Sequence, residues 1–259
     1  VARRDPQQTY ELLTRAALDR LTPGFAWTRY LGAIGAPPVA SVDVSEPKFL
    51  GAADRAVARF SLDDIKAYLR WRLIDAAAPW LPKAFVDENF AFYGKRLTGA
   101  KEIEPQWRRC VEAVDRSLGE DLGKAYVAVA FPPAAKAHTQ AMVGRVAGAF
   151  ADDLKSLDWM SPETRDKAIA KLGMMRKKIG YPDTWRDYSK LAVDRGDALG
   201  NAFRAAGFEL ARELGKIGKP VDRDEWGMTP QTVNAYYNPQ MNDINLAAGI
   251  LQPPFFSPA

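Results

Sequence analysis

The sequence is poor in the residue types that most often bind metals and form cross-links. Its 259 residues include one histidine, His138, and one cysteine, Cys110. A single cysteine excludes an internal disulfide and any cysteine-rich metal site, although it can still pair with a cysteine outside this chain. His138 lies at a helical position with no acidic or histidine partner at ligand spacing, so we interpret it as a surface or satisfied histidine.

Long apolar runs and several common functional motifs are also missing. No run approaches the roughly 18 to 20 apolar residues that a membrane-spanning helix requires. No Gly-rich phosphate loop, GxSxG elbow or CxxC motif occurs. The net charge of +4 comes from 36 basic and 32 acidic residues, and no basic stripe with interleaved aromatics is present. We therefore expect no membrane span within this chain and no nucleic-acid partner.

Three groups of neighbouring carboxylates remain as candidates for acid–base chemistry. They are Asp152 and Asp153, Glu102 and Glu104, and Asp222, Asp224 and Glu225. Adjacent side chains on a helix point apart, so we interpret each group as a solvated face or a turn rather than an acid/base pair.

Helical patterns cover most of the chain. The composition, with 47% hydrophobic and 26% charged residues, is that of a globular protein. Three-and-four spacing and capping residues predict helices over residues 6–21, within 22–38, from 61 or 62 toward 79, and over 105–118, 133–158, 161–180 and 196–214. The best linker candidates are the Pro- and Gly-containing stretches 35–47 and 218–230.

The end of the chain departs from this helical pattern. Val233 to Tyr237 is strand-like, "NPQMND" supplies turn residues, and "INLAAGI" is a second strand-like run, so the pattern predicts a hairpin. The predicted fold is therefore mainly α, with a helical body and a short β-hairpin near the C-terminus. A two-stranded ribbon leaves an edge that can accept an extended peptide as an added strand. The alternative is a hairpin packed purely for stability.

Several motifs resemble those of a known family. They are "VNAYYNP" (233–239), "AGILQPPFF" (248–256), "WMSPETRDKAIAKL" (159–172), "KIGYPDTWRDYSKL" (178–191) and "PQWRRCVEAV" (105–114). On these motifs the chain resembles the neprilysin-like zinc metallopeptidases, which include neprilysin, endothelin-converting enzymes and PepO-type oligopeptidases. The resemblance implies a two-lobed peptidase enclosing a cavity, with residues 1–220 as a mostly helical lobe and linking helices. Residues 221–259 would begin the catalytic domain.

The resemblance also implies roles for five residues. The side-chain amide of Asn234 would hold the substrate backbone, Ala235 would offer backbone groups to the same peptide, and Tyr236 would face the unprimed side of the cleaved bond. Ile250 and Phe255 match positions that line a hydrophobic primed-side pocket. An amide side chain supplies both a donor and an acceptor, which is what a peptide unit needs. Without the motif, Tyr236, Ile250 and Phe255 would be interpreted as core residues.

The family's zinc-binding motif is absent from this sequence. Such enzymes bind zinc through HExxH and a further glutamate, and one histidine cannot make that site. We therefore expect no catalytic residue and no metal ligand in this chain. The chain would be a segment of a zinc-dependent endopeptidase cleaving oligopeptides, with zinc bound by residues outside it, and it would be inactive alone.

The implied partners are a peptide substrate and the remainder of the same peptidase, as a separate chain or otherwise. Resemblance alone implies an extracytoplasmic location, either periplasmic, secreted or anchored by an upstream segment. Cys110 matches a position that is disulfide-bonded in some members, so it would be bridged to the missing portion or be a free buried thiol. The alternative function is a non-catalytic peptide- or protein-binding module, and a helical scaffold without a ligand is a third.

Overall fold

The computed structural model describes residues 9–257, and the chain divides into two compact units. Unit 1 comprises Val1–Ile103 and Val193–Lys219, and unit 2 comprises Glu104–Ala192 and Pro220–Ala259. Each unit is therefore built from two separate stretches of the chain.

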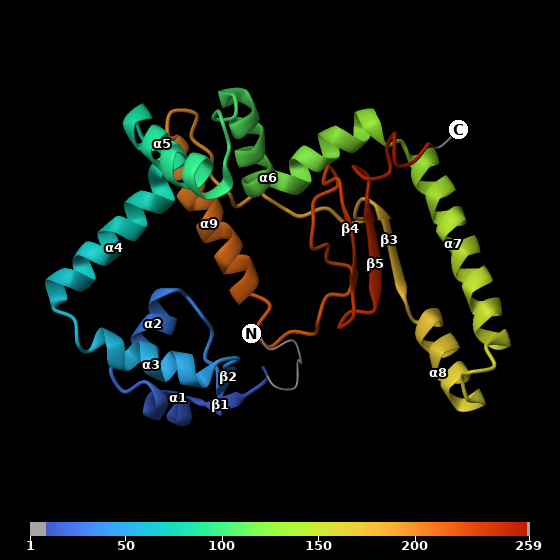
Figure 1. Cartoon of the computed structure of the whole chain (residues 1–259), viewed down its shortest axis with the longest axis horizontal. Helices are drawn as coiled ribbons and strands as arrows, with labels where there is room; N and C mark the ends of the chain where they lie inside the picture. Colours follow the sequence, from blue (N-terminus) through green and yellow to red (C-terminus); the bar gives the residue numbers. More distant parts are fainter. Residues whose placement is uncertain (1–8, 258–259) are drawn as a thin grey trace. The chain divides into compact units, whose positions relative to one another are not determined.

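Unit 1 is mostly helical, with one small antiparallel ribbon (Figure 1). The ribbon pairs β1 (Leu12–Thr14) with β2 (Ser41–Asp43). The helical elements are α1 (Arg15–Leu21), α2 (Trp27–Ala33), α3 (Pro47–Val57), α4 (Leu62–Ala77), a 3-10 turn (Ala78–Trp80), α5 (Lys83–Asn89), a π-helical stretch (Phe90–Thr98) and α9 (Ala198–Leu214).

The beginning of the chain corrects the predicted helix over residues 6–21. Residues 6–8 lie outside the described residues, and residues 12–14 form β1 instead of helix. The helix begins at Arg15 because the Thr14 hydroxyl caps it, accepting a hydrogen bond from the Ala17 N–H at 3.2 Å. The partner strand β2 lies inside the stretch 35–47, which was predicted to be a linker.

Capping signals located the start of α4 correctly. The Ser61 hydroxyl accepts from the Asp64 N–H, and the Asp64 carboxylate accepts from the Ser61 N–H, so both halves of a capping box are present. The helix ends at Ala77, just before Pro79, as predicted. Helices α2 and α9 also lie where the sequence predicted them.

Unit 2 combines long helices with a three-stranded sheet. The helices are α6 (Gln106–Ala130), α7 (Pro133–Ser156) and α8 (Pro162–Gly173), and the strands are β3 (Arg176–Gly180), β4 (Ala235–Asn238) and β5 (Asp243–Ala247). Strand β5 lies between a parallel β3 and an antiparallel β4 (Figure 1). The buried core contains Val127, Phe131, Ala135, Ile179, Ala248 and Leu251. A mainly α fold with a hairpin near its C-terminus is therefore confirmed.

Strand β3 corrects the predicted helix over residues 161–180. Ser161 caps α8 and Pro162 opens it, as predicted, but the helix ends at Gly173. Residues 176–180 pair with β5, which buries Ile179 to 2% exposure and places Lys178 beside an acidic partner. The lysines that resembled the last turn of a helix are therefore strand residues.

Helix α6 extends past the predicted 105–118, but it is interrupted at the predicted end. Leu118 has φ −135° and ψ 36°, which are not helical values, and a second helical stretch continues to Ala130.

Within the part of the chain that the structure describes, no helix has the length and apolar character needed to cross a membrane.

Candidate functional site

The predicted hairpin forms, and β4 lies at an edge of its sheet. The pairing with β3 determines which backbone groups of β4 face outward. The Arg176 N–H donates to the Asn242 carbonyl at 3.0 Å, and the Ala248 N–H donates to the Gly180 carbonyl at 2.8 Å. Backbone groups of a strand alternate between its two neighbours, so even-numbered residues of β5 bond toward β3 and odd-numbered ones bond toward β4.

Because of this alternation, the backbone N–H and C=O groups of two β4 residues point away from the sheet. Tyr236 and Asn238 lie opposite Asn245 and Asp243, so their backbone groups bond to β5. The N–H and C=O groups of Ala235 and Tyr237 therefore point to the outer edge, where no strand within residues 9–257 pairs with them. An extended peptide can be added along such an edge.

Asn234 lies at the start of this edge and is exposed. Its Oδ1 accepts a hydrogen bond from the Ala235 N–H at 2.8 Å. That bond agrees with the outward direction of the Ala235 N–H. The Nδ2 donor of Asn234 and the carbonyl of Ala235 complete a small set of peptide-compatible groups. The structure thus brings Asn234 and Ala235 together on one exposed edge.

Tyr236, the second residue of β4, is half-buried. Its hydroxyl accepts a hydrogen bond from the Gly227 N–H at 2.8 Å. Partial burial raises the pKa of the Tyr236 hydroxyl above its ordinary value; the hydrogen bond from the Gly227 N–H opposes this shift, and the nearby charges of Asp243 and Glu225 add to it. The hydroxyl is therefore protonated at neutral pH and is used within the fold, and its role toward a substrate stays a prediction.

The two predicted pocket residues lie in different environments. Ile250 is half-buried and packs against the core of unit 2. Phe255 is 68% exposed. Phe256, which the sequence analysis did not select, packs against the core and lies 6.3 Å from His138 between ring centroids. A pocket role for Ile250 and Phe255 therefore stays a prediction.

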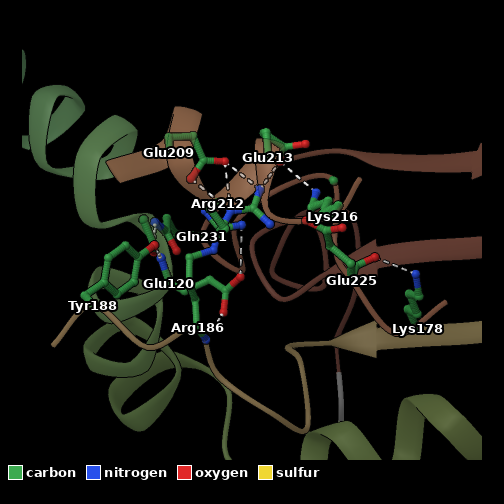
Figure 2. A network of polar contacts seen from close by, with 12 residues as sticks. Glu120, Lys178, Arg186, Tyr188, Glu209, Arg212, Glu213, Lys216, Glu225 and Gln231 are labelled. Carbon is green, nitrogen blue, oxygen red and sulfur yellow. Dashed lines mark hydrogen bonds and ion pairs between the residues drawn. The ribbon is translucent and has the colours of Figure 1, made fainter. Parts of the chain in front are cut away.

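A buried polar network lies beneath the hairpin, and sequence reasoning missed it. The Lys178 ammonium contacts the Asp243 carboxylate at 2.6 Å, and their side chains are 7% and 2% exposed. The other carboxylate oxygen of Asp243 accepts from Asn245 Nδ2 at 2.7 Å. Lys178 also donates to the Glu225 carbonyl at 2.7 Å (Figure 2). The network thus joins β3, β5 and the stretch that leads to β4.

The sequence predicted a linker over residues 218–230; residues 218–224 are exposed, but the end of this stretch is closely packed. Trp226 is 8% exposed and Pro230 is fully buried. The Gly249 N–H donates to the Pro230 carbonyl at 2.8 Å. A Cβ at Gly249 would lie 2.5 Å from the Gln231 carbonyl oxygen and 2.7 Å from that of Thr232. Residue 249 must therefore be glycine for the stretch to lie where it does.

We expect Gly249→Ala to lower the free energy of unfolding by about 1 to 3 kcal/mol, because the added methyl group meets backbone atoms that cannot rotate away. Gly144→Ala on α7 is the matched control, since a Cβ there has open space and alanine favours a helix. Urea unfolding of both variants checks the difference. Equal stability of the two variants would contradict it.

The remaining candidates for metal binding stay apart. Within residues 9–257, no three His, Cys, Asp or Glu side chains come together as a set of metal ligands. His138 is exposed on α7. Cys110 is also exposed, which corrects the alternative of a buried thiol. The Asp222 carboxylate accepts from the Asp224 N–H at 2.9 Å, as a turn residue does.

Comparison with known proteins gives one family. Residues 1–182 match the family model "Peptidase family M13". Endothelin-converting enzyme 1 of Rattus norvegicus is 30% identical over 98% of this chain and 35% of that protein. Neprilysin-3 of Drosophila melanogaster is 31% identical over 98% of this chain and 34% of that protein. The chain thus spans about a third of the length of these curated relatives.

Solved structures agree with these matches. The crystal structure of Mycobacterium tuberculosis zinc metalloprotease Zmp1 in complex with inhibitor is 46% identical, with a TM-score of 0.90 over 98% of this chain and 39% of that one. PepO from Lactobacillus rhamnosis HN001 is 27% identical, with a TM-score of 0.83 over 96% of this chain and 40% of that one. The described fold is therefore found within longer chains.

Proposed function

Because the chain belongs to peptidase family M13, we propose that it is a segment of a zinc-dependent endopeptidase that cleaves oligopeptides. Its part in the reaction is to supply the strand that aligns the substrate. The observation that carries this proposal is the outer edge of β4, where Asn234 and the outward-facing backbone of Ala235 lie together.

The edge would act by adding the substrate to the sheet as a further strand. The carbonyl of Ala235 and the amide of Asn234 would bond to one peptide unit, and the backbone of Tyr237 would bond to the substrate two residues along. Ile250 and Phe255 would line part of the primed-side pocket, and Tyr236 would face the unprimed side. Holding a peptide in a reactive geometry can lower a barrier by roughly 7 to 11 kcal/mol in favourable systems.

Zinc would be bound by residues outside this chain, because the sequence has one histidine and no HExxH motif. When bound, the metal would activate a water molecule and polarise the scissile carbonyl. The chain itself would bind and orient the peptide backbone and would be inactive alone.

The wider organisation also belongs to this proposal. Residues 1–220 would form the mostly helical lobe and linking helices of a two-lobed enzyme, and residues 221–259 would begin its catalytic domain. The partners would be a peptide substrate and the remainder of the peptidase. The location would be extracytoplasmic, as family resemblance implies.

Intact mass spectrometry with zinc analysis tests whether a catalytic remainder accompanies this chain. We expect a species, or a companion fragment, that carries HExxH and stoichiometric zinc, and we expect peptide cleavage only when it is present. Zinc-dependent cleavage by the 259-residue chain alone would contradict the proposal. The 259-residue chain with added zinc is the control.

A non-catalytic peptide-binding module is the second candidate, because β4 lies at the edge of its sheet and such an edge can accept an extended peptide without any metal. The coding sequence beyond Ala259 separates the two functions. HExxH there supports the peptidase, and its absence supports the binding module.

A further inference from the structure

The four residues Thr229 to Thr232 lie shortly before Asn234 and the outer edge of β4. We call this edge the peptide-binding edge, after its proposed function, and the four residues the presenting segment. One oxygen of the Asp115 carboxylate on α6 accepts two hydrogen bonds from this segment, from the Thr229 hydroxyl at 3.1 Å and from Gln231 Nε2. Gln231 Nε2 also donates to the Gly119 carbonyl at 2.9 Å. The presenting segment is thus attached to a helix that is more than 100 positions earlier in the chain.

Two glycines allow the presenting segment to lie against α6. A Cβ at Gly119 would lie 2.4 Å from the Thr229 methyl carbon, and one at Gly123 would lie 2.8 Å from the Pro230 ring. The helix is interrupted at Leu118, immediately before the first of these glycines. A kink frees backbone carbonyls that would otherwise bond within the helix. Here the side chain of Gln231 donates to the carbonyl of Gly119, next to the interruption.

The interrupted turn of α6 is also held from its other side. Glu120 is buried, with 9% of the residue exposed. Its carboxylate accepts a hydrogen bond from the backbone N–H of Arg186 at 2.7 Å. The Glu120 N–H donates to the Tyr188 hydroxyl at 3.3 Å (Figure 2). The turn that binds the presenting segment is therefore fixed within unit 2.

We propose that Asp115 is a positioning residue for the peptide-binding edge: by holding Thr229 and Gln231, it determines where Asn234 is presented to the substrate. This inference rests on the proposed function. Hairpin pairing begins only at Ala235, so the hairpin alone does not place Asn234. The half-buried Asp115 carboxylate supplies the missing constraint from the side of α6.

Loss of this carboxylate should change substrate affinity rather than the chemical step. Without Asp115 the presenting segment would occupy its binding position for only part of the time, and the apparent affinity falls by that fraction. Once the peptide is bound, Asn234 and the β4 edge hold it as in the wild type, so kcat should not change. A general loss of stability would instead reduce the amount of active enzyme, which lowers the apparent kcat and leaves KM unchanged.

For Asp115→Ala in the complete peptidase we expect KM for a fluorescence-quenched oligopeptide to rise about tenfold, with kcat within about twofold of the wild type. Asp115→Asn should restore most of the affinity, because its amide oxygen can still accept from Thr229 and Gln231. Glu112→Ala, one turn earlier on α6, is the matched control, since the Glu112 side chain is 53% exposed and forms an ion pair with Arg116 at 3.9 Å. It should behave as the wild type.

Hydrogen exchange on the 259-residue chain tests the positioning role without any activity. Asp115→Ala should speed exchange at residues 229–235 and leave β5 unchanged. If Asp115→Ala unfolds, Thr229→Val keeps the side-chain shape, removes one donor to Asp115 and should give the same change to a smaller extent. Unchanged exchange in a folded variant, or an unchanged KM, overturns the inference while the proposed function stands. Absence of peptide cleavage by the wild-type complete protein overturns the proposed function.

Discussion

Replacement of Asn234 by alanine should lower kcat/KM of the complete peptidase for oligopeptides by about 10- to 100-fold and leave the fold intact. The expected loss reflects a substrate peptide unit that is desolvated at the edge and then lacks its hydrogen-bond partner. The fold should persist because Asn234 is exposed and its one described hydrogen bond goes to the next residue, Ala235. Steady-state kinetics and the melting temperature measure the two effects separately.

Gln240→Ala is the matched control for this experiment. It removes another exposed amide from the same hairpin, and Gln240 donates a hydrogen bond to Asn238 Oδ1 through its backbone N–H and not through its side chain. Its kcat/KM should equal that of the wild type. An Asn234→Ala variant with wild-type kinetics would place Asn234 outside the substrate site and would favour a hairpin that serves stability alone.

Lys178→Met should give the largest loss of stability, about 3 to 5 kcal/mol in the free energy of unfolding. The substitution leaves the Asp243 carboxylate in a site where its side chain is 2% exposed, with Asn245 as its remaining side-chain donor. A buried charge without its partner costs far more than an exposed one. Urea unfolding followed by circular dichroism provides the measurement.

An exposed ion pair supplies the comparison. Lys167→Met removes a partner of Glu163 on α8, where the two side chains are 75% and 77% exposed, and it should cost less than about 1 kcal/mol. The double variant Lys178→Met with Asp243→Asn should recover much of the loss, because both charges are then absent and Asn245 keeps an acceptor. A cost for Lys178→Met as small as that for Lys167→Met would show that the buried pair does not hold the sheet.

Features with local signals were predictable from the sequence. Ser61 and Asp64 mark the start of α4 through a reciprocal cap, and Ser161 with Pro162 marks the start of α8. The hairpin follows from two strand-like runs separated by turn residues. The motif around Asn234 also located the edge, which the structure shows to be exposed.

Features that depend on distant partners were not predictable in this way. Strand β3 pairs with β5 over a separation of 67 positions, so no residue near 176–180 indicates which segment is its partner. The lysines in that stretch are also common at helix ends, which favoured the wrong assignment. The stretch 218–230 contains Pro and Gly as linkers do, but Asp115 and Gly119 on α6 hold its end.

The parallel pairing of β3 with β5 also determines when the edge can exist during folding. Parallel neighbours need a long crossover, and here residues 181–242 form the connection between β3 and β5. Contacts between residues that are distant in sequence form slowly because the loop-closure entropy must be overcome first. The edge of β4 should therefore mature late, after the helices. A nascent chain would thus not present the outer edge of β4 until residues beyond Ala247 had been synthesised.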